Sequence, residues 1–499
     1  MSNYVEENLR IEYKKAENDL PKSFWDTYSS FSNTKGGYVI LGIEETRKGT
    51  KVTGVKNEQK IIKDLVTLAN DKSYTSYNNI HDENIRIIKE GEHKVIQIYI
   101  PEVSKANKPV YIKGNINNSF IRRNDSDQRM TDIEIRRHLR DANPENDSML
   151  LNNYDISDLD AYAVKNYKNI VQQRETEIDI LSMDDWEFLK RYGAVKKDRE
   201  DGKYKLVKGA LLFFGKENSI VDCFPFFHLD YRNRVGETIK KRWIDRVSSG
   251  EINSTEINVF NFYNIVLEKM VNTVMESFEL NVETQRRENV EEGVKLSIRE
   301  ALANSLIHAD YEENTTIKIE AFKSYYEFNN PGEMLITPEE FAMGSESKTR
   351  NATLFTLFRN AGYSEKAGSG GVRIFQIAKK NKFRMPEIES KDGKTSVKIW
   401  KTDLVSSYDG LNDRETQVLN YIEKKRAVTK KEIQGLEGMT EYYAKLTLGS
   451  LIDKKVIYKI GEGKSTKYGF LQSSSEMVAS IEHDMRHIQN MIINAVKDK

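Results

Sequence analysis

Three polar side chains lie at four-residue intervals within one apolar stretch of the sequence. The segment SIREALANSLIHADY (297–311) carries Glu300, Asn304 and His308 among alanine, leucine and isoleucine residues. On an α-helix these positions share one face, so an acid, an amide and an imidazole would project in the same direction. A carboxylate can orient or deprotonate water, and an amide oxygen is a suitable ligand for Mg²⁺. The alternative is a buried core helix whose polar groups have structural partners.

Two glycine-containing turns follow this predicted helix and indicate the same chemistry. NNPGEM (329–334) comes after a strand-like segment, and KAGSGGVRIF (366–375) opens a second predicted helix, with the polar segment GSESKTRNATLF between them. Glycines let main-chain N–H groups approach phosphates at a helix N-terminus. This order favours a nucleoside-triphosphate cleft in which Asn304 holds Mg²⁺ and Glu300 acts on water. It is not a P-loop, since GEGKST (461–466) lacks the first glycine at the required spacing.

A second group of acids lies near the N-terminus. Glu7 and Glu12 precede Lys14, and a strand here would place Glu12 and Lys14 on the same face. Glu44 and Glu45 follow an apolar strand-like run. Carboxylates converging from two strands could hold a divalent metal for phosphodiester cleavage, with the lysine on the phosphate. The alternative is that these acids, at strand ends and in turns, are simply solvated.

The elements that must position these residues indicate an α+β multidomain chain. Segments 205–216 and 222–234 are apolar runs that favour strands within an otherwise mainly helical region. The expected parts are an N-terminal α/β domain (1–135), a mainly helical connecting region (136–290), a nucleotide-binding domain (291–403), a winged helix (411–470) and an amphipathic C-terminal helix (475–499).

Composition limits the classes of function. Lys plus Arg and Asp plus Glu both total 77, so any nucleic-acid contact must come from local patches rather than from net charge. The single cysteine, Cys223, excludes internal disulfides and cysteine-rich zinc sites. No apolar stretch is long enough for a membrane helix, and the N-terminus has no signal-like apolar region. We therefore expect a soluble, cytoplasmic protein that does not bind membranes.

The region 411–470 has three helical signals followed by two short strand signals around a Gly/Lys turn, which is typical of a winged helix-turn-helix. Thr429 and Glu432 have the spacing of a capping box. A basic pair also ends the N-terminal domain. The candidate phosphate-contacting cations are Arg122, Arg123, Lys445, Lys464 and Lys467. The winged helix also holds many acids, so protein–protein contact is an equally weighted alternative.

The segments REALANSLIHADY, FNNPGEM and RNATLFTLFRNAGYSEKAGSGGVRIF together resemble the GHKL ATPases, the family of gyrases and histidine kinases. The likeness is to a divergent bacterial branch labelled RecG-like or predicted transcriptional regulators. It implies a GHKL-type α/β sandwich that binds ATP or another nucleotide with Mg²⁺, with Glu300 as general base and Asn304 as Mg²⁺ ligand. Asn330 to Gly332 would form the first glycine box, with Asn330 in place of the adenine-reading aspartate, and 337–367 the lid. The second box would comprise Gly368, Gly370 and Gly371.

The N-terminal segments IEYK and WDTYSSFSNTKGGYVILGIEE are similar to the AlbA-like domain of the Schlafen family over most of residues 1–130. In Schlafen nucleases such acids form a metal-dependent ribonuclease site. The resemblance implies that Glu7, Glu12, Lys14 and Glu44 or Glu45 do so here, with Mg²⁺ or Mn²⁺. Glutamate stands where aspartate is usual after the strand.

These features lead to one main hypothesis and two alternatives. The main hypothesis is a nucleotide-gated effector whose N-terminal domain cleaves RNA, for example tRNA, or DNA, with an anti-phage role suggested by family analogy alone. The first alternative is an ATP-binding, DNA-binding transcriptional regulator without nuclease activity. The second is ATP hydrolysis that drives conformational cycling. In each case the C-terminal helix is predicted to make a homo-oligomer, because its apolar residues are spaced like a short heptad seam.

Overall fold

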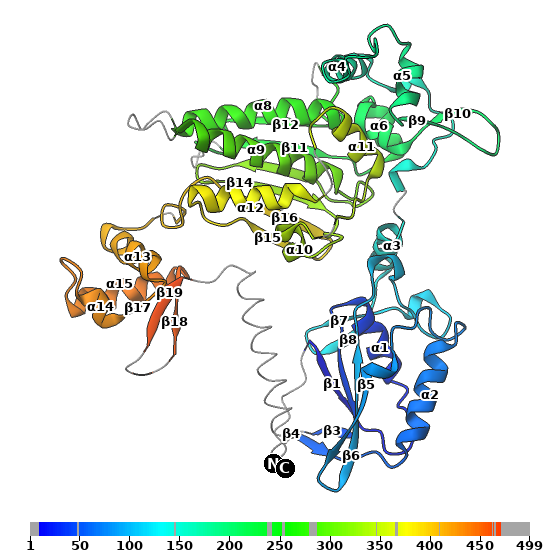
Figure 1. The fold of residues 1–499 in the computed structure, drawn as a ribbon, viewed down its shortest axis with the longest axis vertical. Coiled ribbons are helices and arrows are strands. Elements are labelled where there is room, and N and C mark those ends of the chain that lie inside the picture. The colour runs from blue at the N-terminus through cyan, green and yellow to red at the C-terminus, as the bar shows by residue number, and fades with distance from the viewer. Residues whose placement is uncertain are drawn as a thin grey trace. The chain divides into compact units, whose positions relative to one another are not determined.

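The computed structural model describes residues 9–46, 49–143, 146–236, 242–251, 255–278, 287–345, 347–364, 368–408, 410–461, 463 and 466–470. Glu7, Lys464 and the predicted C-terminal helix lie outside these residues. The chain forms two compact units, Met1–Asn146 and Asp147–Lys499, each taken here by itself. Both mix helices with sheets, which confirms the predicted α+β fold (Figure 1). No helix in the described parts has the length and apolar character needed to cross a membrane.

The first unit is built on a four-stranded sheet with the order β1-β2-β6-β5. Strand β1 is parallel to β2, and the other neighbours are antiparallel. Two hairpins, β3–β4 and β7–β8, extend from this sheet region. The elements are β1 (Ile11–Lys14), α1 (Phe24–Asn33), β2 (Gly37–Leu41), β3 (Ile43–Thr46), β4 (Gly49–Val52), α2 (Glu58–Asn70), β5 (Ile85–Glu90), β6 (His93–Ile100), β7 (Phe120–Arg123), β8 (Ser126–Arg129) and α3 (Asp132–Asp141).

Helix α1 is buried along almost its whole length. Phe24, Tyr28 and Phe31 are fully buried against the sheet. The polar end of the helix is held by Asn33, whose amide donates to the carbonyl of Val110 at 2.8 Å and accepts from its N–H at 2.7 Å. Because buried polar groups need partners, this exchange allows the helix to end inside the domain. The β7–β8 hairpin packs on this helix and bonds to Ser29 and Asn33.

The second unit is built on a six-stranded sheet with the order β12-β11-β13-β14-β16-β15. Helices α8, α9 and α12 cover one face of it (Figure 1). The elements up to this sheet's last strand are α4 (Ala161–Gln172), α5 (Asp185–Arg191), β9 (Val195–Lys197), β10 (Tyr204–Leu206), α6 (Lys208–Phe214), α7 (Glu217–Cys223), β11 (Leu229–Asn233), β12 (Asp245–Ser248), α8 (Val259–Phe278), α9 (Arg287–Ile307), β13 (Ile317–Ala321), β14 (Tyr325–Pro331), α10 (Pro338–Met343), α11 (Ala352–Asn360), α12 (Ser369–Asn381), β15 (Glu387–Lys391) and β16 (Lys394–Trp400).

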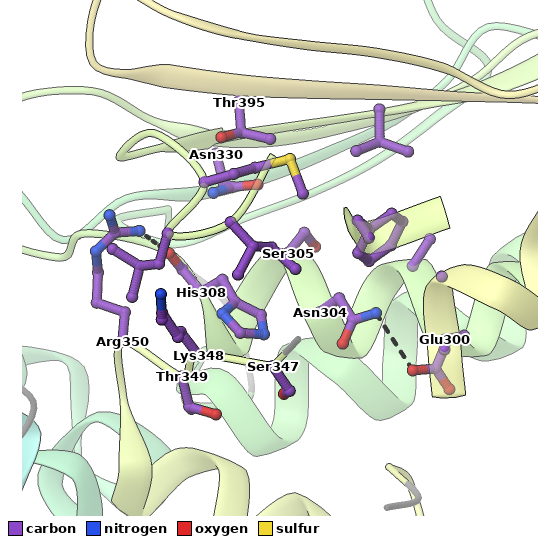
Figure 2. Close-up of a pocket in the computed structure, with 18 of the residues that line it drawn as sticks. Glu300, Asn304, Ser305, His308, Asn330, Ser347, Lys348, Thr349, Arg350 and Thr395 are labelled. Carbon is purple, nitrogen blue, oxygen red and sulfur yellow. Dashed lines mark hydrogen bonds between the residues drawn. The ribbon is translucent and has the colours of Figure 1, made fainter. Parts of the chain in front are cut away.

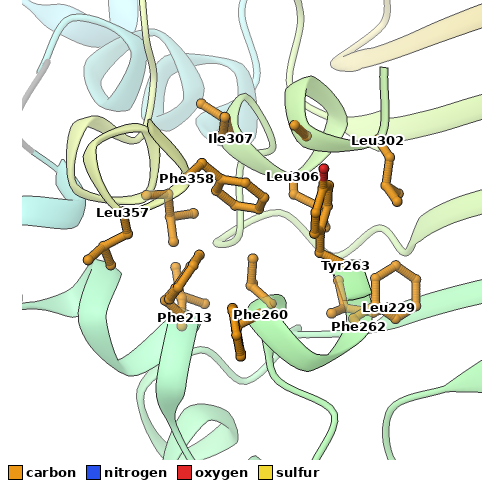
Figure 3. Close-up of a cluster of buried hydrophobic side chains, with 14 of the residues drawn as sticks. Phe213, Leu229, Phe260, Phe262, Tyr263, Leu302, Leu306, Ile307, Leu357 and Phe358 are labelled. Carbon is orange, nitrogen blue, oxygen red and sulfur yellow. The ribbon is translucent and has the colours of Figure 1, made fainter. Parts of the chain in front are cut away.

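A continuous apolar core joins the helices to this sheet (Figure 3). Phe213 of α6 lies with its ring centroid 5.5 Å from that of Phe260 on α8 and 5.3 Å from that of Phe358 on α11. Leu302 and Leu306 bring α9 into the same cluster. Since closely packed interiors transmit displacement, the helix that carries the polar stripe is rigidly coupled to α6 and α11.

Two features of this unit differ from the sequence expectations. The segment 205–216 is not one strand: it forms the end of β10 and then the buried helix α6. A short apolar run does not distinguish a buried strand from a buried helix, so periodicity could not decide this. The sheet also takes β11 and β12 from the region expected to connect domains, so it begins before the boundary at 291.

Within the described residues after 409, the C-terminal part contains three helices and a three-stranded sheet with the order β17-β19-β18. The expected capping box forms between Thr429 and Glu432. The order of elements is that of a winged helix, with β17 as a strand that the sequence did not suggest. The elements are α13 (Asp413–Lys425), β17 (Ala427–Thr429), α14 (Lys430–Gln434), α15 (Glu441–Asp453), β18 (Ile457–Ile460) and β19 (Lys467–Phe470).

Candidate functional site

A pocket in the second unit gathers the polar stripe of α9 (Figure 2). Glu300, Asn304 and His308 all line it, as the four-residue spacing predicted. The Asn304 side chain donates to Glu300 Oε1 at 3.2 Å, and the Glu300 side chain is buried. The donated hydrogen bond leaves the amide oxygen of Asn304 as the acceptor that can bind a cation. An acid and an amide oxygen therefore lie side by side among buried apolar residues of α9.

The second glycine turn lies directly opposite Glu300. A Cβ atom at Gly370 would lie 1.9 Å from Glu300 Oε1, and one at Gly371 would lie 2.1 Å from the carbonyl oxygen of Phe341. Gly368 is the N-cap of α12 and has a φ of +92°. Glycine is thus required for α12 to begin this close to α9 and α10. The first N–H groups of α12 then lie close to the acid. A helix N-terminus is a suitable place for an anion.

The first glycine turn is held by an arginine. Gly332 has a φ of +91°, and a Cβ atom there would lie 2.6 Å from Arg350 Nη1. The guanidinium of Arg350 donates to the carbonyl oxygens of Glu333, at 2.7 Å, and His308. Arg350 therefore ties the first turn to the C-terminal end of α9. The sequence pattern did not single out Arg350, although it lies in the polar segment between the two turns.

The end of the pocket near the first turn combines polar and apolar groups. Asn330 and Thr395 lie opposite each other on β14 and β16 and are both buried. Thr395 donates its hydroxyl to the carbonyl of Gly332 at 2.8 Å, so the hydroxyl oxygen can still accept. Met334 and Val397 line the same pocket. This end suits a flat heterocycle with polar edges, and the α12 end suits its anionic substituent.

His308 is neutral in this pocket. Burial and the nearby cation of Arg350 lower the pKa of His308 to about 4. At neutral pH the imidazole therefore contributes no positive charge towards an anion, and it can only donate or accept hydrogen bonds. This supports a structural role rather than phosphate binding.

In the first unit, Glu12 lies in a cluster of charged side chains. Its carboxylate accepts from Lys14 at 2.9 Å and from Arg122 at 2.7 Å. Arg122 also donates to Asp127 at 2.9 Å, and Asp127 accepts from the hydroxyl of Thr27 on α1. Burial by itself lowers the pKa of Arg122, but Asp127 and Glu12 outweigh that effect and raise it. Glu12 thus serves as a counter-ion to a buried arginine.

The other predicted nuclease acids lie elsewhere. Glu44 is half-buried and its carboxylate lies 3.5 Å from the Lys15 ammonium, and Glu45 is exposed on the same hairpin. Glu7 is outside the described residues. In the described ranges no three His, Cys, Asp or Glu side chains are grouped so that they could hold a metal ion. Beside Glu12 the described residues place two cations, Lys14 and Arg122, rather than a second acid.

The predicted phosphate-contacting cations fall into two groups. The prediction for Arg122 is wrong: its side chain is 1% exposed and pairs with Glu12, so it cannot reach a nucleic acid. Arg123 is 48% exposed and pairs with Glu134 at the surface. Lys445 on α15 and Lys467 on β19 are exposed. These three remain candidates.

Comparisons with protein-family models match three parts of the chain. Residues 7–131 match "Schlafen, AlbA_2", and residues 314–399 match "Putative ATP-dependent DNA helicase recG C-terminal". The predicted resemblance to these two families is confirmed. Between them, residues 136–230 match a domain of unknown function. The recG C-terminal-type match includes both Asn330 and Thr395, but it begins after the α9 stripe.

Comparison with curated proteins gave no match. Among solved structures, a protein of Corynebacterium diphtheriae aligns with 16% identity and a TM-score of 0.38, covering 93% of this chain and 95% of its own. The N-terminal domain of a "Putative ATP-dependent DNA Helicase RecG-related Protein" from Nitrosomonas europaea aligns with 25% identity and a TM-score of 0.20. That alignment covers 26% of this chain and 86% of its own.

Proposed function

We propose that this protein binds a nucleoside triphosphate in the α9–α12 pocket and uses it to control a nucleic-acid-binding activity. One observation carries the proposal: the Glu300–Asn304 pair lies against the glycine-rich N-terminus of α12, in a pocket that the buried Asn330 and Thr395 also line. The ATPase-like and Schlafen-type matches support a nucleic-acid-related, ATP-dependent function.

Different residues of the pocket would bind different parts of the nucleotide. The N–H groups at the start of α12 would bind terminal phosphate oxygens, and Gly370 leaves room for the Glu300 carboxylate beside them. Asn304 would supply one neutral oxygen to Mg²⁺, which is usually held by few protein ligands together with substrate phosphates and waters. Glu300 would orient water for hydrolysis. Asn330 and Thr395 would contact the edge of the base.

For the N-terminal domain, nucleic-acid binding is favoured over cleavage. The oxygens of Glu12 already accept from Lys14 and Arg122, and a metal would have to displace both. Binding through Arg123, whose side chain is 48% exposed, would break no buried ion pair. The metal-dependent nuclease, acting on RNA such as tRNA or on DNA, is the second candidate, supported by the Schlafen-type match alone.

Calorimetry with a non-hydrolysable ATP analogue and Mg²⁺ tests the pocket. Asn304→Ala should weaken Mg²⁺-dependent binding at least tenfold, because it removes the proposed metal ligand. Asn169→Ala, at an exposed position on helix α4, is the matched control and should leave affinity unchanged. Equal affinities for the wild type and Asn304→Ala would remove the assignment of Asn304. No binding of ATP or any other nucleotide by the wild type would overturn the proposed function.

A cleavage assay separates the two candidates for the N-terminal domain. The full chain is incubated with tRNA and with duplex DNA, in Mg²⁺ or Mn²⁺, with and without ATP. We expect nucleotide-dependent changes in nucleic-acid affinity without cleavage. Metal-dependent cleavage that disappears in Glu12→Ala, while nucleotide binding persists, would establish the nuclease instead.

A further inference from the structure

Helix α11 begins beside the pocket, yet its N-terminus is capped from a distant part of the chain. Its own N-cap residue, Asn351, makes no side-chain capping bond. Instead the carboxylate of Asp147 accepts from the main-chain N–H of Thr353 at 3.1 Å and of Leu354 at 2.9 Å. The first N–H groups of a helix need such partners, so Asp147 completes α11.

The side-chain amide of Asn351 is bonded to the end of α9 instead. It donates to the carbonyls of Ile307, at 2.8 Å, and Ala309, at 2.7 Å, at the C-terminal end of α9. The preceding residue, Arg350, donates to the carbonyls of His308 and Glu333. The short segment 350–354 is therefore bonded to the pocket at one end and to Asp147 at the other.

The joint at Asp147 leaves little room for another arrangement. Asp147 is 2% exposed, and burial raises its pKa although Thr353 and Leu354 donate to it. The hydroxyl of Ser148 lies 3.1 Å from that of Thr353. On α6, a Cβ atom at Gly209 would lie 2.6 Å from Asp147 Oδ2, so glycine makes space for the carboxylate. A displacement of the α11 N-terminus must therefore either carry Asp147 with it or break these bonds.

Asp147 is the first residue of the second unit, where the chain arrives from helix α3 of the first unit. We propose that Asp147 is a positioning residue that transmits the state of the pocket to this junction. Ser347 to Arg350 line the pocket, so a bound nucleotide contacts the segment whose continuation Asp147 holds. This role rests on the proposed nucleotide binding. It adds a route by which nucleotide bound in the second unit affects the segment that connects α3 to Asp147.

Hydrogen-exchange mass spectrometry of the full chain, with and without the Mg²⁺ complex of a non-hydrolysable ATP analogue, tests this route. In the wild type we expect slower exchange in peptides covering 298–308 and 368–378, and a change in peptides covering 132–150. In Asp147→Asn the pocket peptides should respond as before, while the response at 132–150 should fall at least several-fold. A preserved pocket response also shows that the variant is folded.

Two further variants make the outcome specific. Asp184→Asn is the matched control, because Asp184 likewise caps two N–H groups, those of Trp186 and Glu187 on α5, but is bonded only locally. It should leave both responses unchanged. Gly209→Ala pushes the Asp147 carboxylate from the other side and should reproduce the Asp147→Asn result.

Each outcome bears on one conclusion. A pocket response in the wild type without any change at 132–150, or an unchanged junction response in Asp147→Asn, would overturn the role of Asp147 and leave nucleotide binding intact. The absence of any pocket response in the wild type would overturn the proposed function itself, and this inference with it.

Discussion

Replacing Arg122 by methionine gives the sharpest test of the charge cluster in the first unit. The side chain of Arg122 is 1% exposed, and those of Glu12 and Asp127 are 12% exposed. Methionine keeps most of the apolar volume but takes the guanidinium away from both carboxylates, of which Glu12 keeps Lys14 as a partner. Such a change is costly because a mostly buried charge that loses its partner is no longer compensated.

The size of the effect can be worked from the contacts. Arg122 makes one charge-assisted hydrogen bond to Glu12 and one to Asp127, each worth about 1.5–3 kcal/mol. The sum, roughly 3–6 kcal/mol, agrees with the about 3–5 kcal/mol found when one partner of a buried ion pair is removed. The neighbouring Arg123 is 48% exposed, so Arg123→Met should cost at most about 1 kcal/mol.

Hydrogen exchange in β1 and α1 of the full chain measures this difference. Arg122→Met should raise the opening equilibrium by roughly two to four orders of magnitude, and Arg123→Met by less than about tenfold. Adding Asp127→Asn to Arg122→Met should restore part of the protection, since Glu12 keeps Lys14 as its partner and the Asp127 charge is gone. Equal opening equilibria for Arg122→Met and Arg123→Met would show that the cluster does not stabilise the domain.

Three further predictions concern the second unit. Gly370→Ala should displace the Glu300 carboxylate, so ATP hydrolysis measured by phosphate release should fall at least tenfold while calorimetric affinity stays within a few-fold; unchanged hydrolysis would contradict the proposed role of Glu300. Because the pKa of His308 is lowered from 6.5 to about 4, its stabilising contribution is present above about pH 6.5 and is lost as pH falls towards 4. Over that pH range the free energy of opening measured by hydrogen exchange in α9 should fall by at most about 3 kcal/mol more in the wild type than in His308→Gln. Parallel pH profiles for the two proteins would contradict this prediction. Lys454→Met removes one partner of the buried Glu415 carboxylate and should lower the free energy of unfolding of the winged helix by about 1–3 kcal/mol, measured in urea. No change would show that the remaining partners, such as Ser450, are sufficient for Glu415.

Local features of the chain were readable without the fold. The spacing of Glu300, Asn304 and His308 placed them on one helix face, and the glycine turns at 332 and 368 have the positive φ angles that glycine allows. These predictions held because helix periodicity and glycine stereochemistry depend on neighbours a few residues apart. The α+β fold was predictable for the same reason, from the alternation of helical and strand periods.

The features that only the tertiary structure decided are contacts between residues far apart in the sequence. No pattern indicated that Arg122 would take up the oxygens of Glu12, or that Asp147 would cap a helix that starts at Ala352. The placement of β11 beside β13 in one sheet is of the same kind. Such pairings follow from which elements pack together, and packing is decided by the burial of whole apolar faces rather than by local spacing. The sequence by itself therefore located the pocket, while the fold determined which charges near it and in the first unit are free to act.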